Sequence, residues 1–354
     1  MSKKIDRYLQ EALKSGASDL HFVSGDPVRA RVHGDLEILM EEHLSAEVAE
    51  EAIYEIMDGT TQRTFEAEEA ADFAHEIEGV SRFRVNAFRH LNGIGAIFRA
   101  IPSTALSLEH LNMPKVLYDL CKQNAGMILV TGKTGSGKST TLAAMIDSIN
   151  STNPGHILTI EDPIEFVHKT KRSLISQREV GEHSPSFAEA LHSALREDPD
   201  VILVGEMRDL ETISIAVTAA EMGILVMGTL HTKRAAQPVD RIINSFPADK
   251  QSHIRTMIST SLRGVVSQQL LPTKGKPGRV AALEVMINTT AVANLIRQGK
   301  LDQLETAMQS GGSSGMQTMD SALMSLVEGA MICGKDAYLQ ANNKAKFERM
   351  KNET

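Results

Sequence analysis

The stretch GMILVTGKTGSGKST, residues 126–140, decides the fold of this chain. An apolar run ends there in a glycine-rich turn that carries a lysine and two hydroxyl groups. Residues 132–139 fit the pattern G-x-x-x-x-G-K-[ST], which is specific when a strand precedes it and a helix follows it. Both neighbours have the expected pattern. The stretch therefore predicts a phosphate-binding loop and a site for a nucleoside triphosphate.

Each residue type in this loop has a chemical reason. Glycines let backbone N–H groups converge on phosphates at the positive end of the next helix. Lys138 is expected to reach the β- and γ-phosphates, and the Ser139 hydroxyl to bind Mg²⁺. The alternative is a glycine-rich turn without a ligand, which the flanking strand and helix disfavour. The residues predicted to hold ATP are Gly132, Lys133, Thr134, Gly135, Ser136, Gly137, Lys138, Ser139 and Thr140.

Around the loop, apolar runs alternate with helical patterns. The runs lie at 126–131, 156–161, 200–206 and 223–231, and helical patterns separate them. Continuous apolar runs are typical of parallel strands that are covered on both faces. The alternation predicts an α/β domain with a parallel sheet. We expect this ATPase domain to span residues 115–288 and a helical C-terminal region to span 289–354.

Polar residues stand where these apolar runs stop. Glu161 and Glu165 follow the second run, Glu206 ends the third, and His231 ends the fourth. Ligands of open parallel sheets bind beyond the carboxyl ends of the strands. We therefore expect these four side chains to converge beside the phosphate loop.

Glu206 is the best candidate for catalysis, because it could orient or deprotonate the attacking water or hold Mg²⁺. The alternative is an acid that caps the next helix. Glu161 and Glu165 are candidates to support the metal or the water, and first-turn acids are an equal alternative. His231 is a candidate sensor of the γ-phosphate, because imidazole can donate to a phosphate oxygen; a structural, hydrogen-bonded histidine is the alternative.

The first hundred residues have a different pattern. Helical segments and short alternating strands predict a small α+β domain over residues 1–100, joined by a linker at 101–114. Arg82, Arg84 and Arg99 belong to it, and by default they are a solvated strand face. Phosphoryl transfer, however, needs positive charge near the γ-phosphate, and a neighbouring subunit can supply it. In that case the protein acts as a ring or another oligomer.

Composition narrows the classes of function. The net charge of −8 and the absence of tryptophan disfavour a nucleic-acid translocase, so no nucleic-acid partner is expected. Two distant cysteines indicate neither a disulfide framework nor a zinc site, which favours a reducing compartment. Without an apolar run of about 18 residues, the chain is expected to be cytoplasmic.

Several further motifs accompany the phosphate loop. They are SDLHF at 18–22, RFRVNAF at 82–88, TIEDPIEFVH at 159–168, ALREDPDVILVGEMRDLETI at 194–213, GTLHT at 228–232, GRVAALEVMI at 278–287 and GMQTMDSAL at 315–323. Together they resemble the type II/type IV secretion ATPase superfamily, and most closely the PilT-type pilus retraction ATPases. The resemblance covers nearly the whole chain, and its Asp box, Walker B region and His box are more specific than the phosphate loop alone.

The resemblance implies a PAS-like N-terminal domain on a RecA-like ATPase core, assembled as a homohexamer. ATP hydrolysis with Mg²⁺ would drive type IV pilus retraction and twitching motility, through a platform protein in the inner membrane with which the ring associates peripherally. By position, Glu206 is the catalytic glutamate and His231 the His-box histidine. Glu161 and Glu165 are Asp-box acids, and Arg82, Arg84 and Arg99 contact a neighbour's nucleotide.

One segment departs from the family pattern. The retraction signature A-I-R-N-L-I-R reads AVANLIR at 291–297, with Ala293 in place of the first arginine. This leaves an accessory retraction ATPase, or one that works with a second retraction ATPase, as an alternative. A related secretion ATPase and a nucleotide-gated binding module with little hydrolysis also stay open. The four-cysteine zinc module usual in assembly ATPases is absent, which favours retraction.

Overall fold

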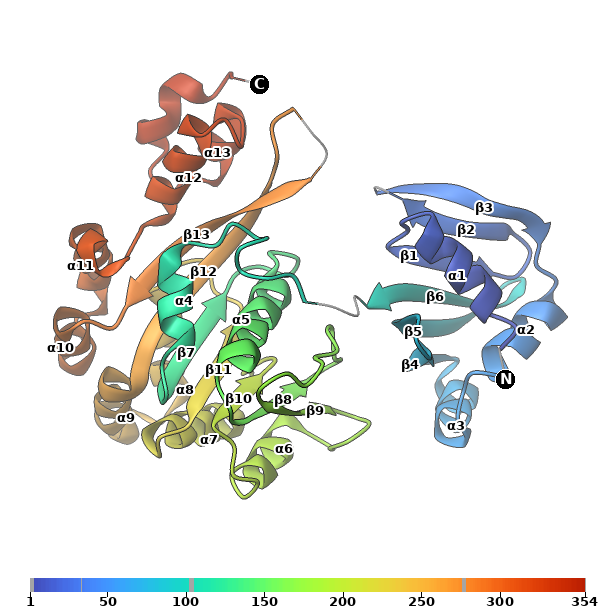
Figure 1. Ribbon diagram of the computed structural model, residues 1–354, viewed down its shortest axis with the longest axis horizontal. Coiled ribbons are helices and arrows are strands. Elements are labelled where there is room, and N and C mark those ends of the chain that lie inside the picture. The colour runs from blue at the N-terminus through green and yellow to red at the C-terminus, as the bar shows by residue number, and fades with distance from the viewer. Residues whose placement is uncertain (1–2, 33, 102–104, 276–277, 354) are drawn as a thin grey trace. The chain divides into compact units, whose positions relative to one another are not determined.

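The structure is a computed structural model that describes residues 3–32, 34–101, 105–275 and 278–353 (Figure 1). The chain divides into two compact units, Met1–Thr104 and Ala105–Thr354. Of the linker expected at 101–114, residues 102–104 lie outside the described residues, and Leu108 is buried in the core of the second unit. The finer division into four parts stays a prediction.

The first unit is built on a six-stranded sheet in the order β3-β2-β1-β6-β5-β4, in which all neighbours are antiparallel. The strands are β1 (Asp19–Val23), β2 (Pro27–Val32), β3 (Asp35–His43), β4 (Ala70–Ile77), β5 (Ser81–His90) and β6 (Gly93–Ile101), and the helices are α1 (Asp6–Lys14), α2 (Ala46–Tyr54) and α3 (Gly59–Glu68). The small α+β fold predicted for this region is therefore present.

Helices α1, α2 and α3 cover one face of this sheet. Phe22, Phe83 and Phe98 from the strands pack with Tyr8 of α1 and Phe65 of α3 in one buried cluster. Because side chains alternate along a strand, the residues between them lie on the opposite face. That opposite face carries five arginines: Arg29, Arg31, Arg82, Arg84 and Arg99.

The second unit contains a seven-stranded sheet in the order β13-β12-β7-β11-β10-β8-β9. Its strands are β7 (Gly126–Thr131), β8 (His156–Glu161), β9 (Leu174–Glu179), β10 (Val201–Val204), β11 (Leu225–Leu230), β12 (Leu262–Pro272) and β13 (Arg279–Ile287). All neighbours are parallel except β12 and β13. The predicted parallel α/β core is confirmed, and β9, β12 and β13 extend it beyond the four predicted strands.

Helices cover both faces of this second sheet. They are α4 (Lys115–Cys121), α5 (Lys138–Thr152), α6 (Phe187–Ala194), α7 (Leu210–Glu221), α8 (Gln237–Ser245), α9 (Ala248–Ser261), α10 (Thr290–Gln298), α11 (Leu304–Ser310), α12 (Met319–Glu328) and α13 (Gly334–Gln340), with short 3-10 turns η1 (Leu301–Gln303), η2 (Gly312–Ser314) and η3 (Lys344–Met350).

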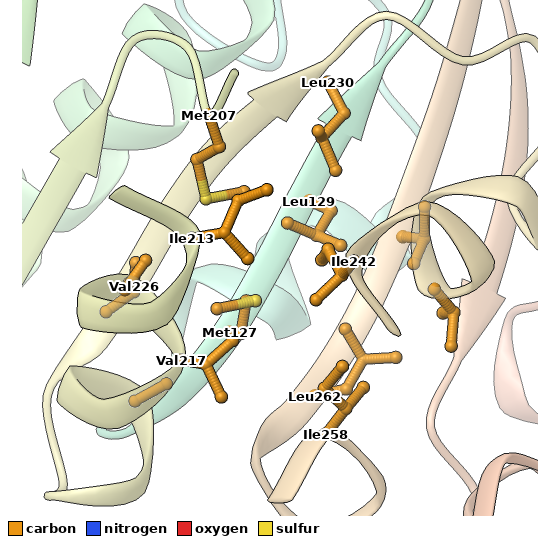
Figure 2. Packing of buried hydrophobic residues seen from close by; sticks show 14 of the residues in the cluster. Met127, Leu129, Met207, Ile213, Val217, Val226, Leu230, Ile242, Ile258 and Leu262 are labelled. Atoms are coloured by element: carbon orange, nitrogen blue, oxygen red, sulfur yellow. The ribbon is translucent and has the colours of Figure 1, made fainter. Parts of the chain in front are cut away.

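The alternation within β7 shows how the two faces are filled. Ile128 and Val130 pack with α4 and α5, whereas Met127 and Leu129 pack with α7, α8 and α9. Figure 2 shows the second of these layers, with Met127 and Leu129 surrounded by Ile213, Val217 and other apolar side chains. Burying an apolar side chain of this size contributes about 1.5–3 kcal/mol, so β7, which is buried at every position, is strongly stabilised by its four central residues.

The C-terminal helices form a smaller cluster on the end of β12 and β13. Leu323 of α12 and Phe347 of η3 are buried against Leu271 and Ala282 from those two strands. This cluster brings the chain after α13 towards the end of β12. In the part of the chain that the structure describes, no helix is both long and apolar enough to cross a bilayer.

Candidate nucleotide site

The phosphate loop joins β7 to α5 and takes a shape that requires glycine. Gly132, Gly135 and Gly137 have φ angles of 149°, 75° and 86°, a region in which side chains with a Cβ are strained. A Cβ on Gly132 would lie 2.4 Å from Ser136 Oγ and 2.5 Å from the Gln268 carbonyl oxygen. The tight loop is what aims its backbone N–H groups, and the first N–H groups of α5, at one point.

The polar side chains of the loop differ in burial. Lys133 and Thr134 are exposed, whereas Ser136 is buried and its hydroxyl has no hydrogen-bond partner among the described residues. Ser139 and Thr140, in the first turn of α5, are half-buried, and their hydroxyls make no hydrogen bond within the described ranges. These hydroxyls are therefore open to another oxygen or a cation.

Lys138 donates from Nζ to the carbonyl oxygens of Gly132 and Lys133, at 3.2 and 3.3 Å. Burial lowers the pKa of its ammonium, and the negative charges of Glu206 and Glu165 act in the opposite direction. The lysine therefore stands within the field of two of the carboxylates that the sequence placed at strand ends.

Glu206 follows β10 and is the centre of a small ionic cluster. His231 Nε2, just after the neighbouring strand β11, lies 3.0 Å from Glu206 Oε1. Arg208 reaches back over the loop, with Nε 2.6 Å from Oε1 and Nη2 2.6 Å from Oε2. Burial alone would raise the pKa of Glu206, but the Arg208 hydrogen bond and the His231 and Arg208 charges bring it below its usual value.

Glu161, at the end of β8, has a different environment. Its Oε1 accepts hydrogen bonds from Thr159 Oγ1 at 2.6 Å and from Gln177 Nε2 at 3.3 Å. Burial raises the pKa of this carboxyl to about 7, and the hydrogen bonds only partly oppose it. Glu165 is exposed, and its negative charge pushes the pKa of Glu161 further up.

The three arginines named from the sequence belong to the first unit. Arg99 Nε lies 2.8 Å from Oδ1 of Asp19, whose side chain is buried, and Arg84 lies 3.7 Å from Asp72. Arg82 is half-buried at the start of β5. Their role at a neighbour's nucleotide stays a prediction.

Two further residues of the site were not predicted. Arg208 stands two positions after Glu206, in the irregular segment between β10 and α7. Gln268 of β12 donates from Nε2 to the Ser136 carbonyl and accepts from Thr141 Oγ1, both at 2.7 Å. It fastens the phosphate loop to the neighbouring strand. Its strand was not predicted, so nothing in the sequence placed it beside the loop.

Comparisons with known proteins show which family this chain resembles. A family model described as type II/IV secretion system protein matches residues 1–334. The chain is 51% identical to the type IV pilus retraction ATPase PilT of Pseudomonas aeruginosa, over 95% of this chain and 98% of that protein. It is 53% identical to a twitching motility protein of Neisseria gonorrhoeae, over 88% and 84% of the two chains.

A solved structure of the pilus retraction motor PilT with bound ADP has the same fold. It superposes with a TM-score of 0.91 at 43% identity, over 99% of this chain and 100% of that one. The predicted RecA-like secretion ATPase fold is thereby confirmed. On the strength of the family match and these relatives, the chain belongs to the type II/IV secretion system protein family, among the PilT-like ATPases.

Proposed function

We propose that this protein hydrolyses ATP to power the retraction of type IV pili, and hence twitching motility. The observation that carries the proposal is the contact between Glu206 and His231, 3.0 Å apart, at the strand ends beside a phosphate loop. The similarity to PilT, which extends over 95% of the chain, supports retraction as the work done.

In this mechanism the phosphate loop holds the triphosphate and Glu206 acts on water. A carboxyl whose pKa lies below its usual value is ionised at neutral pH, so Glu206 can orient the attacking water and accept its proton. His231, in contact with Glu206 and one strand away, would respond to the γ-phosphate. Lys138 would leave the loop carbonyls for the β- and γ-phosphates.

The residues present fit Mg²⁺. The Ser139 hydroxyl makes no hydrogen bond within the described residues, and Glu206 supplies carboxylate oxygen. Mg²⁺ in nucleotide sites is bound by such hard oxygen donors together with the substrate phosphates rather than by a cage of protein ligands. When bound, it neutralises charge that develops on the phosphates. Glu161 and Glu165 would support the water or the metal from the next strand.

The assembly proposed is a homohexamer at the inner membrane. Arg82, Arg84 and Arg99 would reach the nucleotide of a neighbouring subunit, which couples hydrolysis to movement between subunits. The moving ring would act on an inner-membrane pilus platform protein, with a second retraction ATPase as a further partner. The support for this is the family membership and the position of the arginines on an open sheet face.

The decisive experiment counts surface pili on cells that carry Glu206→Gln at the native locus. Retraction predicts cells crowded with pili that no longer move; bald cells would assign the ATP to assembly or secretion. The matched control is Glu211→Gln, an exposed acid five residues further on, which should leave pili and movement unchanged. Steady-state ATP turnover equal in wild type and Lys138→Ala would instead favour a binding module without hydrolysis.

A further inference from the structure

The loop between β11 and α8 spans residues 231–236 and has no regular secondary structure. It begins with His231, whose Nε2 lies 3.0 Å from Oε1 of Glu206. Further along, Lys233 and Arg234 are exposed, so packing does not hold the middle of the loop. The place of His231 therefore depends on β11 on one side and, on the other, on the contacts that hold the far end of the loop.

A buried carboxylate holds that far end. Glu284 of β13 is 3% exposed, and its Oε1 accepts the backbone N–H of Ala235 at 2.6 Å. Its Oε2 accepts the backbone N–H of Met319, the first residue of α12, at 3.1 Å. Burial raises the pKa of the Glu284 carboxyl, and the two N–H groups oppose this because they favour the ionised form. One side chain thus joins the His231 loop to the helix that begins the C-terminal cluster.

Two exposed side chains also contact this loop. Gln237 Oε1 accepts the N–H of Lys233 at 3.0 Å, and Glu305 Oε2 of α11 lies 3.3 Å from Arg234 Nη1. Exposed ion pairs of this kind contribute little, because water screens them and both side chains lose freedom. The Glu284 carboxylate is different, because hydrogen bonds to an ionised group are stronger and its removal leaves buried N–H groups unpaired. Glu284 is therefore the strongest of these anchors.

Glu284 also belongs to a row of polar residues that ends at the phosphate loop. It pairs in the sheet with Ser267 of β12, and Ser267 pairs with Thr131, the last residue of β7. Residues paired on adjacent strands lie on the same face of the sheet, so the three side chains are neighbours. All three are buried, and neither hydroxyl has a hydrogen-bond partner within the described ranges. Glu284 is thus connected to both sides of the site, through the His231 loop and through the strand that leads into Gly132.

We propose that Glu284 is a positioning residue for hydrolysis, which fixes the loop after β11 so that His231 keeps its contact with Glu206. This inference rests on the proposed ATPase function. The charge and hydrogen bond of His231 help to hold the pKa of Glu206 below its usual value, so a displaced loop weakens the base. A misplacement of about 1 Å in a catalytic group can lower a rate about a hundredfold. Because the same carboxylate holds α12, the position of the loop is set against the C-terminal cluster before a nucleotide binds.

The first test compares ATP turnover of the full-length Glu284→Gln and Glu305→Gln variants with wild type. Glutamine keeps the shape of glutamate but offers one acceptor oxygen, so either the Ala235 or the Met319 N–H loses its partner. In Glu284→Gln, kcat per nucleotide-binding site should fall about tenfold while the KM for ATP is retained, because the phosphate loop is unchanged. Glu305→Gln, the matched control, breaks only the exposed pair with Arg234 and should keep the wild-type kcat. A wild-type kcat in Glu284→Gln would overturn the proposal.

The second test separates positioning of His231 from a purely structural role, through a double-mutant cycle. In a His231→Ala background, Glu284→Gln should change kcat by less than about twofold, because no imidazole is left to position. An equal fold-loss with and without His231 would assign Glu284 to folding only and overturn the proposal. Thermal unfolding of the four proteins records the cost in stability separately.

Should Glu284→Gln not fold, Glu284→Asp serves the same cycle, because it keeps the charge but shortens the side chain by one methylene. The same two outcomes then decide between positioning and folding. Failure of the proposed function is distinct, because wild type itself would then not hydrolyse ATP.

Discussion

The neighbouring strands β8 and β10 each end near a glutamate, and the two carboxyls have opposite tendencies. Glu161 is half-buried with a hydroxyl and an amide as partners, and desolvation raises its pKa to about 7. Glu206 is also partly buried, but the guanidinium of Arg208 and the imidazole of His231 bring its pKa below the usual value. The pKa of a glutamate at these adjacent strand ends therefore depends on whether a positively charged group lies close enough to offset the effect of burial.

This difference assigns distinct roles to the two acids. Sites that need both an acid and a base commonly separate the pKa values of two groups through their environments. At neutral pH Glu206 is ionised and able to accept a proton, whereas Glu161 is close to half protonated. The topology of the sheet puts both residues at one edge, and the neighbouring side chains decide which of them is ionised at neutral pH.

Replacing the ionised acid has the largest expected effect. Glu206→Gln should lower ATP turnover by about a thousandfold, in the middle of the range for a lost general base. ATP affinity should stay close to wild type, because the phosphate loop is untouched. Steady-state turnover and nucleotide binding of the purified protein measure the two quantities, with Glu211→Gln as the control. A larger loss of ATP turnover in Glu161→Gln than in Glu206→Gln would mean that Glu161, and not Glu206, acts as the base.

Glu161→Gln should act on stability in a way that depends on pH. The folded protein holds a proton on Glu161 between its ordinary pKa of 4.5 and about 7, so folded chains bind more protons than unfolded ones in that window. The stability of wild type therefore falls as pH rises through it, by up to about 3 kcal/mol. Glutamine does not titrate. The free energy of unfolding of the variant, relative to that of wild type, should therefore be higher at pH 8 than at pH 5.

Denaturant unfolding at both pH values measures this gain. The exposed Glu211→Gln serves again as the control and should differ from wild type equally at pH 5 and pH 8. A difference for Glu161→Gln that does not change with pH would mean that Glu161 titrates like an exposed acid. The contrast between the two strand ends would then disappear.

Arg208→Ala tests the cation that distinguishes Glu206. Without the guanidinium the pKa of Glu206 should rise, so the acid limb of the pH–turnover profile should move to higher pH. Arg178→Ala, which breaks the 2.7 Å ion pair with Glu197 away from the loop, is the matched control and should leave the limb in place. An unmoved limb in Arg208→Ala would leave His231 as the dominant partner.

The sequence predicts the strands whose two faces are both buried. It does not predict β9, β12 and β13, the remaining strands of the sheet. β7, β10 and β11 are buried at every position, so most of their residues are apolar. β9 lies at the edge of the sheet, and its first residue, Leu174, is 59% exposed. Its mixed sequence LISQRE is what an edge position allows. β12 carries the polar residues Ser267 and Gln268, which interrupt its apolar run, and Gln268 hydrogen-bonds the phosphate loop.

Site residues could likewise be predicted where they end a buried strand, and not where they depend on loops or edge strands. Glu206 and His231 could be placed from the sequence because each ends an apolar run, and parallel neighbours bring such ends together. Arg208 could not be placed, because its two contacts with the Glu206 carboxylate depend on the path of an irregular loop. The charge state of Glu161 could not be predicted either, because it depends first on burial, and then on partners such as Gln177, which β9 brings alongside β8.

The smallest expected effect comes from Thr159→Val, which removes a hydrogen bond from Glu161 and keeps the β-branched shape of a fully buried residue. This hydrogen bond favours the ionised carboxylate, so its loss should raise the pKa of Glu161 further. The variant should lose about 1 kcal/mol of stability at pH 8, where Glu161 is ionised, and much less at pH 5. Denaturant unfolding at the two pH values measures the difference.

Thr229→Val on β11 is the control for that measurement. Thr229 Oγ1 donates to the Gly205 carbonyl oxygen, which does not titrate, so its loss should cost the same at pH 5 and pH 8. If Thr159→Val also lowers the free energy of unfolding equally at pH 5 and pH 8, then Glu161 keeps one protonation state across this range. Burial, and not the hydrogen bond from Thr159, would then set its charge. A cost confined to high pH would mean that a single hydroxyl helps decide when the second acid of the site gives up its proton.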